Sequence, residues 1–415
     1  MKQRFGRVRV ALTVLVAWGA VAGGGLTDGV AANAADGALR RTGAVPVAPG
    51  VTYGAFRMTV PHGLVRGHLL TIDLTDPRVA VDLLHPDAVG ARLPVSQLAD
   101  DRGAVGAVNG DFFNISEGQH PGVEATGASV GPEVASGRQL KGAVPDGQRF
   151  GPAMPPGATT EDVIGVGYDR RARLDRLTLH GTVRTPRGAL PLGGLNQYAL
   201  PVGGIGAYTR WWGPVSRMRA TCGTDTDRGA PCSTDTAEVT VRHGRVAAVD
   251  GRPGAGGVAA GSVVLLGREE GARRLRELRI GERVRVDHRL VGRGAGRLRW
   301  AVGGFPIVRD DGPVAGLDTV AVAVRTAAGI GDGGRVLYLM ALDGAHEEGQ
   351  TGLTVRELAD LMDQLGAEDA MDLDGGGSST LVTDDGDGTG VVVRNHPSGG
   401  AERPVANAIG VFSTD

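Results

Sequence analysis

The sequence contains few lysines and has no excess of either charge, and its balanced charge argues against two classes of partner. Lys2 and Lys141 are its only lysines, and 44 basic residues are balanced by 46 acidic ones, for a net charge of −2. Such a chain has no electrostatic basis for binding nucleic acid or an anionic membrane surface. The 9 histidines show no HxH or HxxxH spacing, so the sequence predicts no metal site and no cofactor, while leaving a divalent metal open.

The sequence also lacks an apolar run long enough to cross a membrane, and we expect no membrane span. Four basic side chains in the first nine residues precede the apolar run 10–22 and the small residues Ala32-Asn33-Ala34. This order is typical of a secretory signal peptide. We therefore predict a signal peptide over 1–34, cleaved near Ala34, and a secreted protein. The preference for Arg, Ala, Gly and Val is typical of a GC-rich bacterial genome.

Cysteine is scarce, and its placement has a simple interpretation. Cys222 and Cys232 bracket a polar loop rich in Thr, Asp and Gly. In an oxidising compartment, two cysteines this close in sequence most simply form a local disulfide. A metal site would need further His or Cys ligands, and none is adjacent in the sequence.

Glycine, by contrast, is abundant, with 70 residues and no regular period. Glycines separate short runs of Val, Leu and Ile, which is the pattern of many strands joined by tight turns. The one confident helix is 355–365, where Thr354 and Glu357 form a capping box and Gly366 supplies the stop. We predict an α+β fold of strand-rich mixed sheets with few helices: a flexible lead-in over 35–50 and a single domain over 51–415.

The stretch MDLDGGGSST (371–380) carries the strongest chemical signal. Asp372 and Asp374 are one residue apart on an apolar run, so a strand would place both carboxylates on one face. Three glycines can expose backbone N–H groups to an anion, and two serines add donors. Aspartates also cap glycine turns for purely structural reasons. The combination nevertheless favours a functional role, more strongly for Asp374 than for Asp372.

Two further stretches have both a structural and a functional interpretation. Asn109-Gly110-Asp111-Phe112-Phe113 ends a predicted strand, either as a hairpin turn with core aromatics or as a carboxylate beside an aromatic floor for a sugar ring. Arg325-Thr326 ends another strand. Its guanidinium could hold a carboxylate or phosphate, or could simply be a surface arginine.

Taken in order, several stretches resemble the phosphodiester glycosidase family. They span roughly 95–410: AVNGDFF (107–113), LNQ (195–197), AVGGFPIV (301–308), RTAAGI (325–330), LDG (342–344), GLTVRELADL (352–361), GAEDAMDLDGGGSSTL (366–381) and ERPVANAI (402–409). The resemblance implies an α+β fold and a secreted hydrolase of sugar-1-phosphodiesters. The loop 116–160 and the loop between Cys222 and Cys232 match no family stretch, and we expect them to shape the pocket or its surroundings.

The family's site, carried over motif by motif, implies two sets of residues. The catalytic carboxylates would be Asp374, as base or nucleophile, with Asp343 or Asp111 as its partner. The substrate-binding residues would be Asn109, Arg325, Thr326, Gly375, Gly376, Gly377, Ser378, Ser379 and Arg403. The substrate would be a sugar-phosphate or related glycan. Two alternatives remain open: a phosphodiesterase acting at phosphorus, and a non-catalytic module that binds wall glycans.

Overall fold

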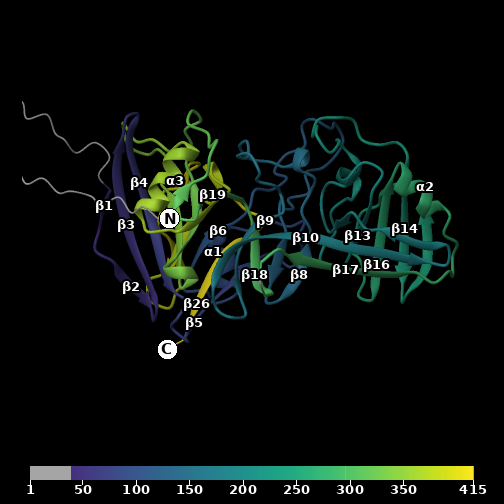
Figure 1. The fold of residues 1–415 in the computed structure, drawn as a ribbon, viewed down its shortest axis with the longest axis horizontal. Coiled ribbons are helices and arrows are strands. Elements are labelled where there is room, and N and C mark those ends of the chain that lie inside the picture. Colours follow the sequence, from purple (N-terminus) through teal and green to yellow (C-terminus); the bar gives the residue numbers. More distant parts are fainter. Residues whose placement is uncertain (1–38, 295, 415) are drawn as a thin grey trace, which may run out of the picture. The chain divides into compact units, whose positions relative to one another are not determined.

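The structure is a computed structural model, and it describes residues 39–294 and 296–414, within one compact unit that spans Gly37–Asp415 (Figure 1). The predicted signal peptide 1–34 lies outside the described residues. Strands dominate, and the described part of the chain has three α-helices, which confirms the predicted strand-rich α+β class. None of the described helices has the length and apolar character that crossing a membrane would require.

The largest sheet, called the central sheet, is antiparallel throughout its pairings. Its middle strands β21 and β22 are almost wholly buried, because both of their faces are covered. In spatial order its strands are β1 (Arg40–Arg41), β3 (Val51–Val60), β4 (Gly63–Asp73), β22 (Val336–Leu342), β21 (Thr326–Gly331), β23 (Asp369–Leu373), β19 (Phe305–Arg309) and β20 (Gly312–Pro313), with β2 (Val45–Ala48) paired to β3.

A second sheet packs against one face of the central sheet. Apolar side chains of both sheets, such as Leu70 and Leu339 from one and Leu83 and Ile409 from the other, form a single core. In spatial order its strands are β25 (Val391–Val393), β24 (Leu381–Asp384), β6 (Gly106–Asn109), β26 (Ala408–Ser413) and β5 (Val79–Leu84). The helix α1 (Val95–Asp100) lies beside this sheet, with Val95, Leu98 and Ala99 buried.

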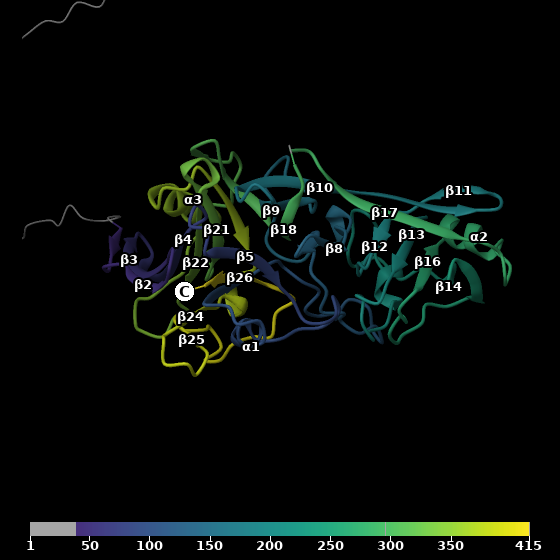
Figure 2. The ribbon, with the colours of Figure 1, turned by 90° about the horizontal axis from the view of Figure 1, so that it is seen from below.

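The opposite face of the central sheet is covered by α3 (Val355–Gln364), which Figure 2 shows on the other side of β21 and β22 from β5 and β26. The predicted helix and its capping box are confirmed: Thr354 Oγ1 accepts from the Glu357 amide, and the Glu357 carboxylate accepts from the Thr354 amide. Leu358, Leu361 and Met362 are fully buried against the sheet. Because the central sheet is covered on both faces, its middle strands have continuous apolar sequences.

Two more sheets are formed by the middle of the chain. One contains β11 (Gly188–Pro191), β10 (Ala172–Thr185), β9 (Asp162–Gly167), β18 (Leu298–Gly303), β7 (Glu133–Ala135) and β8 (Arg138–Lys141), with β17 (Arg285–Gly292) paired to β10. The other contains β12 (Gly194–Leu195), β13 (Ile205–Tyr208), β16 (Ser262–Arg268), β14 (Thr236–Arg242) and β15 (Arg245–Asp250), and α2 (Glu270–Arg276) packs on it. This last sheet has its own apolar cluster, and the long strands β10 and β17 connect the two sheets (Figures 1 and 2).

The predicted flexible lead-in 35–50 needs correction in its second part. Arg40–Arg41 and Val45–Ala48 form β1 and β2, and both pair with β3. Val47 and Ala48 pack against the main core. Apolar contact and strand pairing therefore fix a segment whose composition looked like that of a linker.

Candidate active site

Three aspartates converge where the central and second sheets meet. Asp372 is in β23 and Asp374 directly follows it, while Asp111 comes two residues after β6 of the second sheet. The Asp374 amide donates to the Gly110 carbonyl oxygen at 2.9 Å, which fastens the two strand ends together. The negative charge of Asp374 raises the pKa of Asp372, and that of Asp111 raises the pKa of Asp374. The three carboxyls therefore form one electrostatic group.

Asp111 is held in a narrow slot between two glycines. Its Oδ2 accepts from the Gly131 amide at 2.5 Å, and a Cβ on Gly303 would lie 2.5 Å from the same oxygen. The carboxyl is buried, and Oδ1 has no hydrogen-bond partner within the described residues. Burial raises its pKa to about 6, against the opposing effects of the Gly131 amide and Lys141. A buried carboxyl with an unpaired oxygen is typical of a functional site.

Asp372 is even less well paired. It is 0% exposed, and neither carboxyl oxygen has a hydrogen-bond partner in the part of the chain that the structure describes. The nearest cation is Arg325, whose Nη1 lies 3.9 Å from Oδ2. Burial raises the Asp372 pKa to about 7 despite Arg325 and Arg149. The sequence pattern favours a functional role less strongly for Asp372 than for Asp374. In the structure, its burial without hydrogen-bond partners is nevertheless unusual for a carboxyl.

Asp374 is the only one of the three aspartates that is partly exposed. Desolvation raises its pKa to about 7, while the Ser378 hydroxyl and the Arg403 charge oppose that rise. Arg403 Nη1 also lies 3.3 Å from the Ser378 hydroxyl, and its guanidinium packs so closely on Gly377 that a Cβ there would clash. Asp374 and Arg403, both partly exposed, thus stand on either side of the buried Ser378 hydroxyl, and together they set one carboxyl close to one cation.

Arg149 completes the site, and sequence reasoning missed it. Its guanidinium lies over the stacked rings of Phe112 and Phe305, at 5.3 and 5.4 Å from their centroids. Desolvation lowers the pKa of Arg149, and the negative charges of Asp111 and Asp372 oppose this decrease. The residue belongs to the Gly/Pro-rich loop 116–160, where no motif distinguishes it from other arginines. Phe112 and Phe305 are buried and support Arg149 from the core. Phe113 is buried as well, so the predicted pair Phe112 and Phe113 is not an open floor for a sugar.

The disulfide-closed loop holds Arg149 in place. The predicted bond between Cys222 and Cys232 is present. Within that loop, Arg228 Nη1 donates to the Arg149 carbonyl oxygen at 2.8 Å, and the Gly147 amide donates to the Asp225 carbonyl oxygen at 3.0 Å. The two segments that matched no family stretch therefore contact each other, and together they place a cation beside the aspartates.

Three of the predicted substrate-binding residues instead form a buried hub beneath Asp374. Asn109, Thr326 and Ser379 are inaccessible to solvent. The Thr326 hydroxyl is 3.0 Å from both Asn109 Oδ1 and Ser379 Oγ, and Asn109 Nδ2 donates to the Asp374 carbonyl oxygen at 2.6 Å. These side chains hold the backbone of the loop, so the prediction of direct substrate contact is corrected to one of positioning.

Arg325, Gly375 and Gly376 also differ from their predicted roles. Arg325 donates from Nε to the Leu353 carbonyl oxygen at 2.9 Å and from Nη2 to the Ala321 carbonyl oxygen at 2.7 Å. The guanidinium is buried and fixes two loops, so it is not an open phosphate clamp. The Gly376 amide donates to the Val324 carbonyl oxygen at 2.8 Å, and the Gly375 amide binds the Asp374 carboxyl. Of the predicted anion-binding residues, Arg403 remains as a partly exposed group that could contact an anion, and the buried Ser378 hydroxyl accepts from it.

Asp343 directly follows β22 at the same edge, but its hydrogen-bond partners are His68 and His396. His68 Nε2 is 3.0 Å and the His396 amide 2.8 Å from its Oδ1. Burial raises its pKa, but these two donors outweigh burial and the net pKa is lowered. For Asp374, apart from desolvation, the charge of Arg403 lowers the pKa and the charge of Asp111 raises it. Asp111 is therefore the better partner carboxyl for Asp374.

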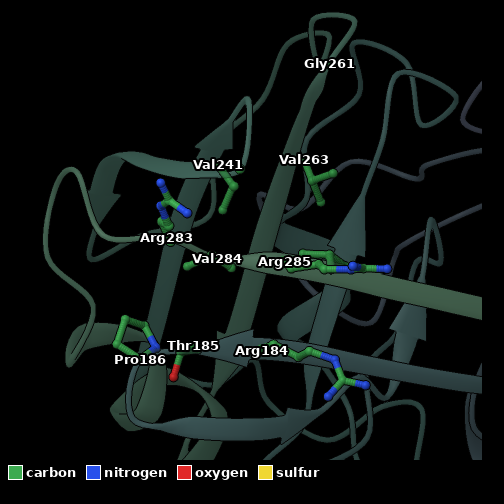
Figure 3. A pocket seen from close by; sticks show the side chains of 11 residues that line it. Arg184, Thr185, Pro186, Val241, Gly261, Val263, Arg283, Val284 and Arg285 are labelled. Carbon is green, nitrogen blue, oxygen red and sulfur yellow. The ribbon is translucent and has the colours of Figure 1, made fainter.

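One cavity on the two sheets formed by the middle of the chain is not part of this site. A cavity of about 590 Å³ lies at β14, β16 and β17, and Val241, Val263, Val284, Arg184, Arg283 and Arg285 are among the residues that line it (Figure 3). Arg184 and Arg285 both share Asp287 as their ion-pair partner. Because its lining is valine and arginine, this cavity offers no acid or base for hydrolysis.

The fold and the site define a strand-rich α+β protein with a carboxyl-rich, arginine-flanked site at the ends of three strands. Residues 235–412 match the model of the phosphodiester glycosidase family. This confirms the resemblance predicted from the motifs over that part of the chain, which includes Asp374, Ser378 and Arg403. Asp111 and Arg149 lie outside the matched residues.

Comparison with solved structures supports the fold. A hypothetical protein from Synechocystis has a TM-score of 0.67 at 21% identity, over 88% of this chain, and this chain spans 62% of that one. A Burkholderia pseudomallei protein described as exported has a TM-score of 0.67 at 19% identity, over 91% of this chain and 96% of its own. At these identities the likeness shows the fold alone.

A weaker match is the zebrafish catalytic domain of N-acetylglucosamine-1-phosphodiester α-N-acetylglucosaminidase, auto-inhibited by its pro-peptide. It has a TM-score of 0.44 at 14% identity, over 91% of this chain and 88% of that domain. No curated protein matches the chain.

Proposed function

We propose that this protein hydrolyses the glycosidic bond of sugar-1-phosphodiesters. The observation that carries the proposal is the group formed by Asp374, Ser378 and Arg403, in which a partly exposed aspartate and a partly exposed arginine meet at a buried hydroxyl. A sugar-1-phosphodiester needs both functions next to each other, a carboxylate for the anomeric carbon and a cation for the phosphate. The family match over 235–412 supports the same substrate class.

In the proposed reaction, the ionised Asp374 either attacks the anomeric carbon, forming a glycosyl-enzyme ester that water then hydrolyses to free sugar and carboxylate, or deprotonates a water that attacks that carbon. The bond between that carbon and its oxygen breaks, and the electron pair leaves with the phosphomonoester. Arg403, oriented by the Ser378 hydroxyl, holds the phosphate, and Arg149 balances the buried charge of Asp111 and Asp372. Because a phosphomonoester is already a good leaving group, no strong general acid is required.

The first test is a screen of the purified protein against sugar-1-phosphodiesters and against bis(4-nitrophenyl) phosphate, which has no glycosidic bond. The proposal predicts release of free sugar and phosphomonoester from the former and no turnover of the latter. Preferential cleavage of bis(4-nitrophenyl) phosphate would favour a phosphodiesterase. Binding of glycans without any turnover would favour a wall-glycan-binding module.

Arg403 provides a specific test of phosphate binding. We expect Arg403→Gln to lower kcat/KM by about 10- to 100-fold, mainly through a higher KM, because one charge-assisted hydrogen bond to phosphate contributes about 1.5–3 kcal/mol. Arg403→Lys should recover part of the loss. Arg356→Gln is the matched control, since that arginine is exposed on α3 and paired with Asp360. Unchanged kinetics in Arg403→Gln would remove Arg403 from the site.

Secretion belongs to this proposal as well, because residues 1–34 have the order of a signal peptide. Outside a bacterium, the available substrates of this class are sugar-phosphate polymers of cell walls and capsules. Recovery of the chain from the culture medium with an N-terminus near Ala35 would support secretion, and retention of an intact N-terminus inside the cell would argue against it.

A further inference from the structure

We propose that Asp343, His346 and His396 form a binding site for a divalent transition-metal ion, with zinc as the best-fitting candidate. One carboxylate oxygen and two imidazole nitrogens are available, and the three ligand atoms lie within 4.8 Å of one another. Carboxylate and imidazole are the usual partners of zinc in sites with three protein ligands and one open position. This inference does not depend on the proposed hydrolysis.

The distances suit a metal of this size. His396 Nδ1 lies 3.5 Å from Asp343 Oδ1. Two ligands bound tetrahedrally at about 2.0–2.1 Å from one zinc ion stand roughly 3.3 Å apart. The rings of His346 and His396 are stacked with centroids 3.7 Å apart, and both side chains are exposed, so small rotations of the rings can bring both nitrogens to one ion.

The outer hydrogen bonds already prepare two of the ligands. His346 Nδ1 lies 3.0 Å from the Gly344 carbonyl oxygen, which can only accept, so Nδ1 donates there. Nε2 lies 3.7 Å from Glu347 Oε1, beyond hydrogen-bond distance, and is the nitrogen left for an ion. The Tyr53 hydroxyl lies 2.7 Å from His68 Nδ1, and with the phenol as donor, His68 Nε2 donates to Asp343 Oδ1 at 3.0 Å. A carboxylate oriented by a histidine, and a histidine oriented by a carbonyl, are the usual second layer of a zinc site.

The site is open to solvent on one side. Asp343, His346 and His396 line a cavity of about 690 Å³, together with Arg57 and Arg66. An ion would enter the site through this cavity. One position of its coordination shell would stay open to water. The ion would also hold the segment that contains His396. In the same segment, Ser398 Oγ donates to the Gly376 carbonyl oxygen at 3.3 Å.

A second cluster of this kind, formed by His120, Cys222 and Cys232, is excluded because the two cysteines are joined in the disulfide. The experiment must therefore be run without reductant, so that no thiol becomes available. The full chain is stripped with chelator and titrated with Zn²⁺ by calorimetry, and with Co²⁺ by absorption, which reports the coordination geometry directly.

We expect one Zn²⁺ per chain and tetrahedral Co²⁺ absorption bands. His346→Gln and His396→Gln should each weaken binding at least tenfold, and His68→Gln by about 10- to 100-fold as an outer partner. His243→Asn, which removes an exposed histidine from the β14–β15 turn, is the control and should bind as the wild type does. A wild type that binds no zinc, or a His346→Gln/His396→Gln double variant that binds it unchanged, would overturn the proposal. Both histidines are exposed, so these variants test binding without disturbing the core.

Discussion

Replacing Asp374 with Asn is expected to lower kcat/KM for sugar-1-phosphodiesters by about 10³-fold, within the roughly 10²- to 10⁴-fold range for a single acid or base group. The amide has nearly the same shape but cannot act as nucleophile or base. Asp374 stands at the edge of the site, and the variant keeps the hydrogen bond from the backbone N–H of residue 374 to the Gly110 carbonyl oxygen. The variant should therefore fold and still bind substrate. Rates in single turnover and a binding titration check both statements.

The same assignment fixes the direction of the pH dependence. Asp374 must be ionised to act, and burial places its pKa at about 7. The wild-type kcat/KM should therefore rise with pH up to about pH 7 and then level off. Asp385→Asn, in the exposed β24–β25 turn, is the control and should leave both rate and profile unchanged. Full activity in Asp374→Asn would refute the role, and binding lost together with activity would leave the positioning of the loop as its only function.

Replacing Asp372 with Asn is expected to stabilise the protein at pH 8 and to have little effect near pH 4. The folded-state pKa of Asp372 is about 7, whereas an unfolded aspartate has a pKa of about 3.9. Between these two values the unfolded chain has lost the proton that the folded chain still holds. Raising the pH therefore removes stability, by up to about 4 kcal/mol for this group, and the asparagine variant escapes that loss.

Urea denaturation at pH 5 and pH 8 measures this effect for the wild type and for Asp372→Asn. Arg325 keeps its bonds to the Leu353 and Ala321 carbonyl oxygens in the variant, so the guanidinium is not left unpaired. Asp111 and Asp374 contribute pH dependence of the same sign, since their pKa values are also raised, and the variant should lose only part of the total slope. A variant that is less stable than the wild type at pH 8 would instead show that ionised Asp372 is a stabilising partner of Arg325.

The features that could be predicted from the sequence are those encoded by neighbouring residues. The capping box of α3, the strand-rich class and the bond between Cys222 and Cys232 each depend on a few adjacent side chains. The loop after β23 was also identifiable, because its two aspartates, three glycines and two serines occur in one run. The catalytic role of Asp374 stays a prediction, and its raised pKa and its proximity to Arg403 support it.

The remaining parts of the site depend on contacts between distant segments. Arg149 reaches the aspartates only because the loop closed by Cys222 and Cys232 holds its backbone. Arg325 looked like a free anion clamp, but its acceptors are the carbonyl oxygens of Ala321 and Leu353, the latter 28 residues away. Asp343 binds His68, 275 residues earlier in the chain. No local pattern encodes such partners, and they decide whether a charged side chain faces a ligand or the protein.

The central claim is that the bond between the anomeric carbon and its oxygen is broken, and hydrolysis in ¹⁸O-labelled water tests it directly. If Asp374 acts at the anomeric carbon, mass spectrometry will find the label on the released sugar and none on the phosphomonoester. Label on the phosphate would show that water enters at phosphorus, and would contradict the account.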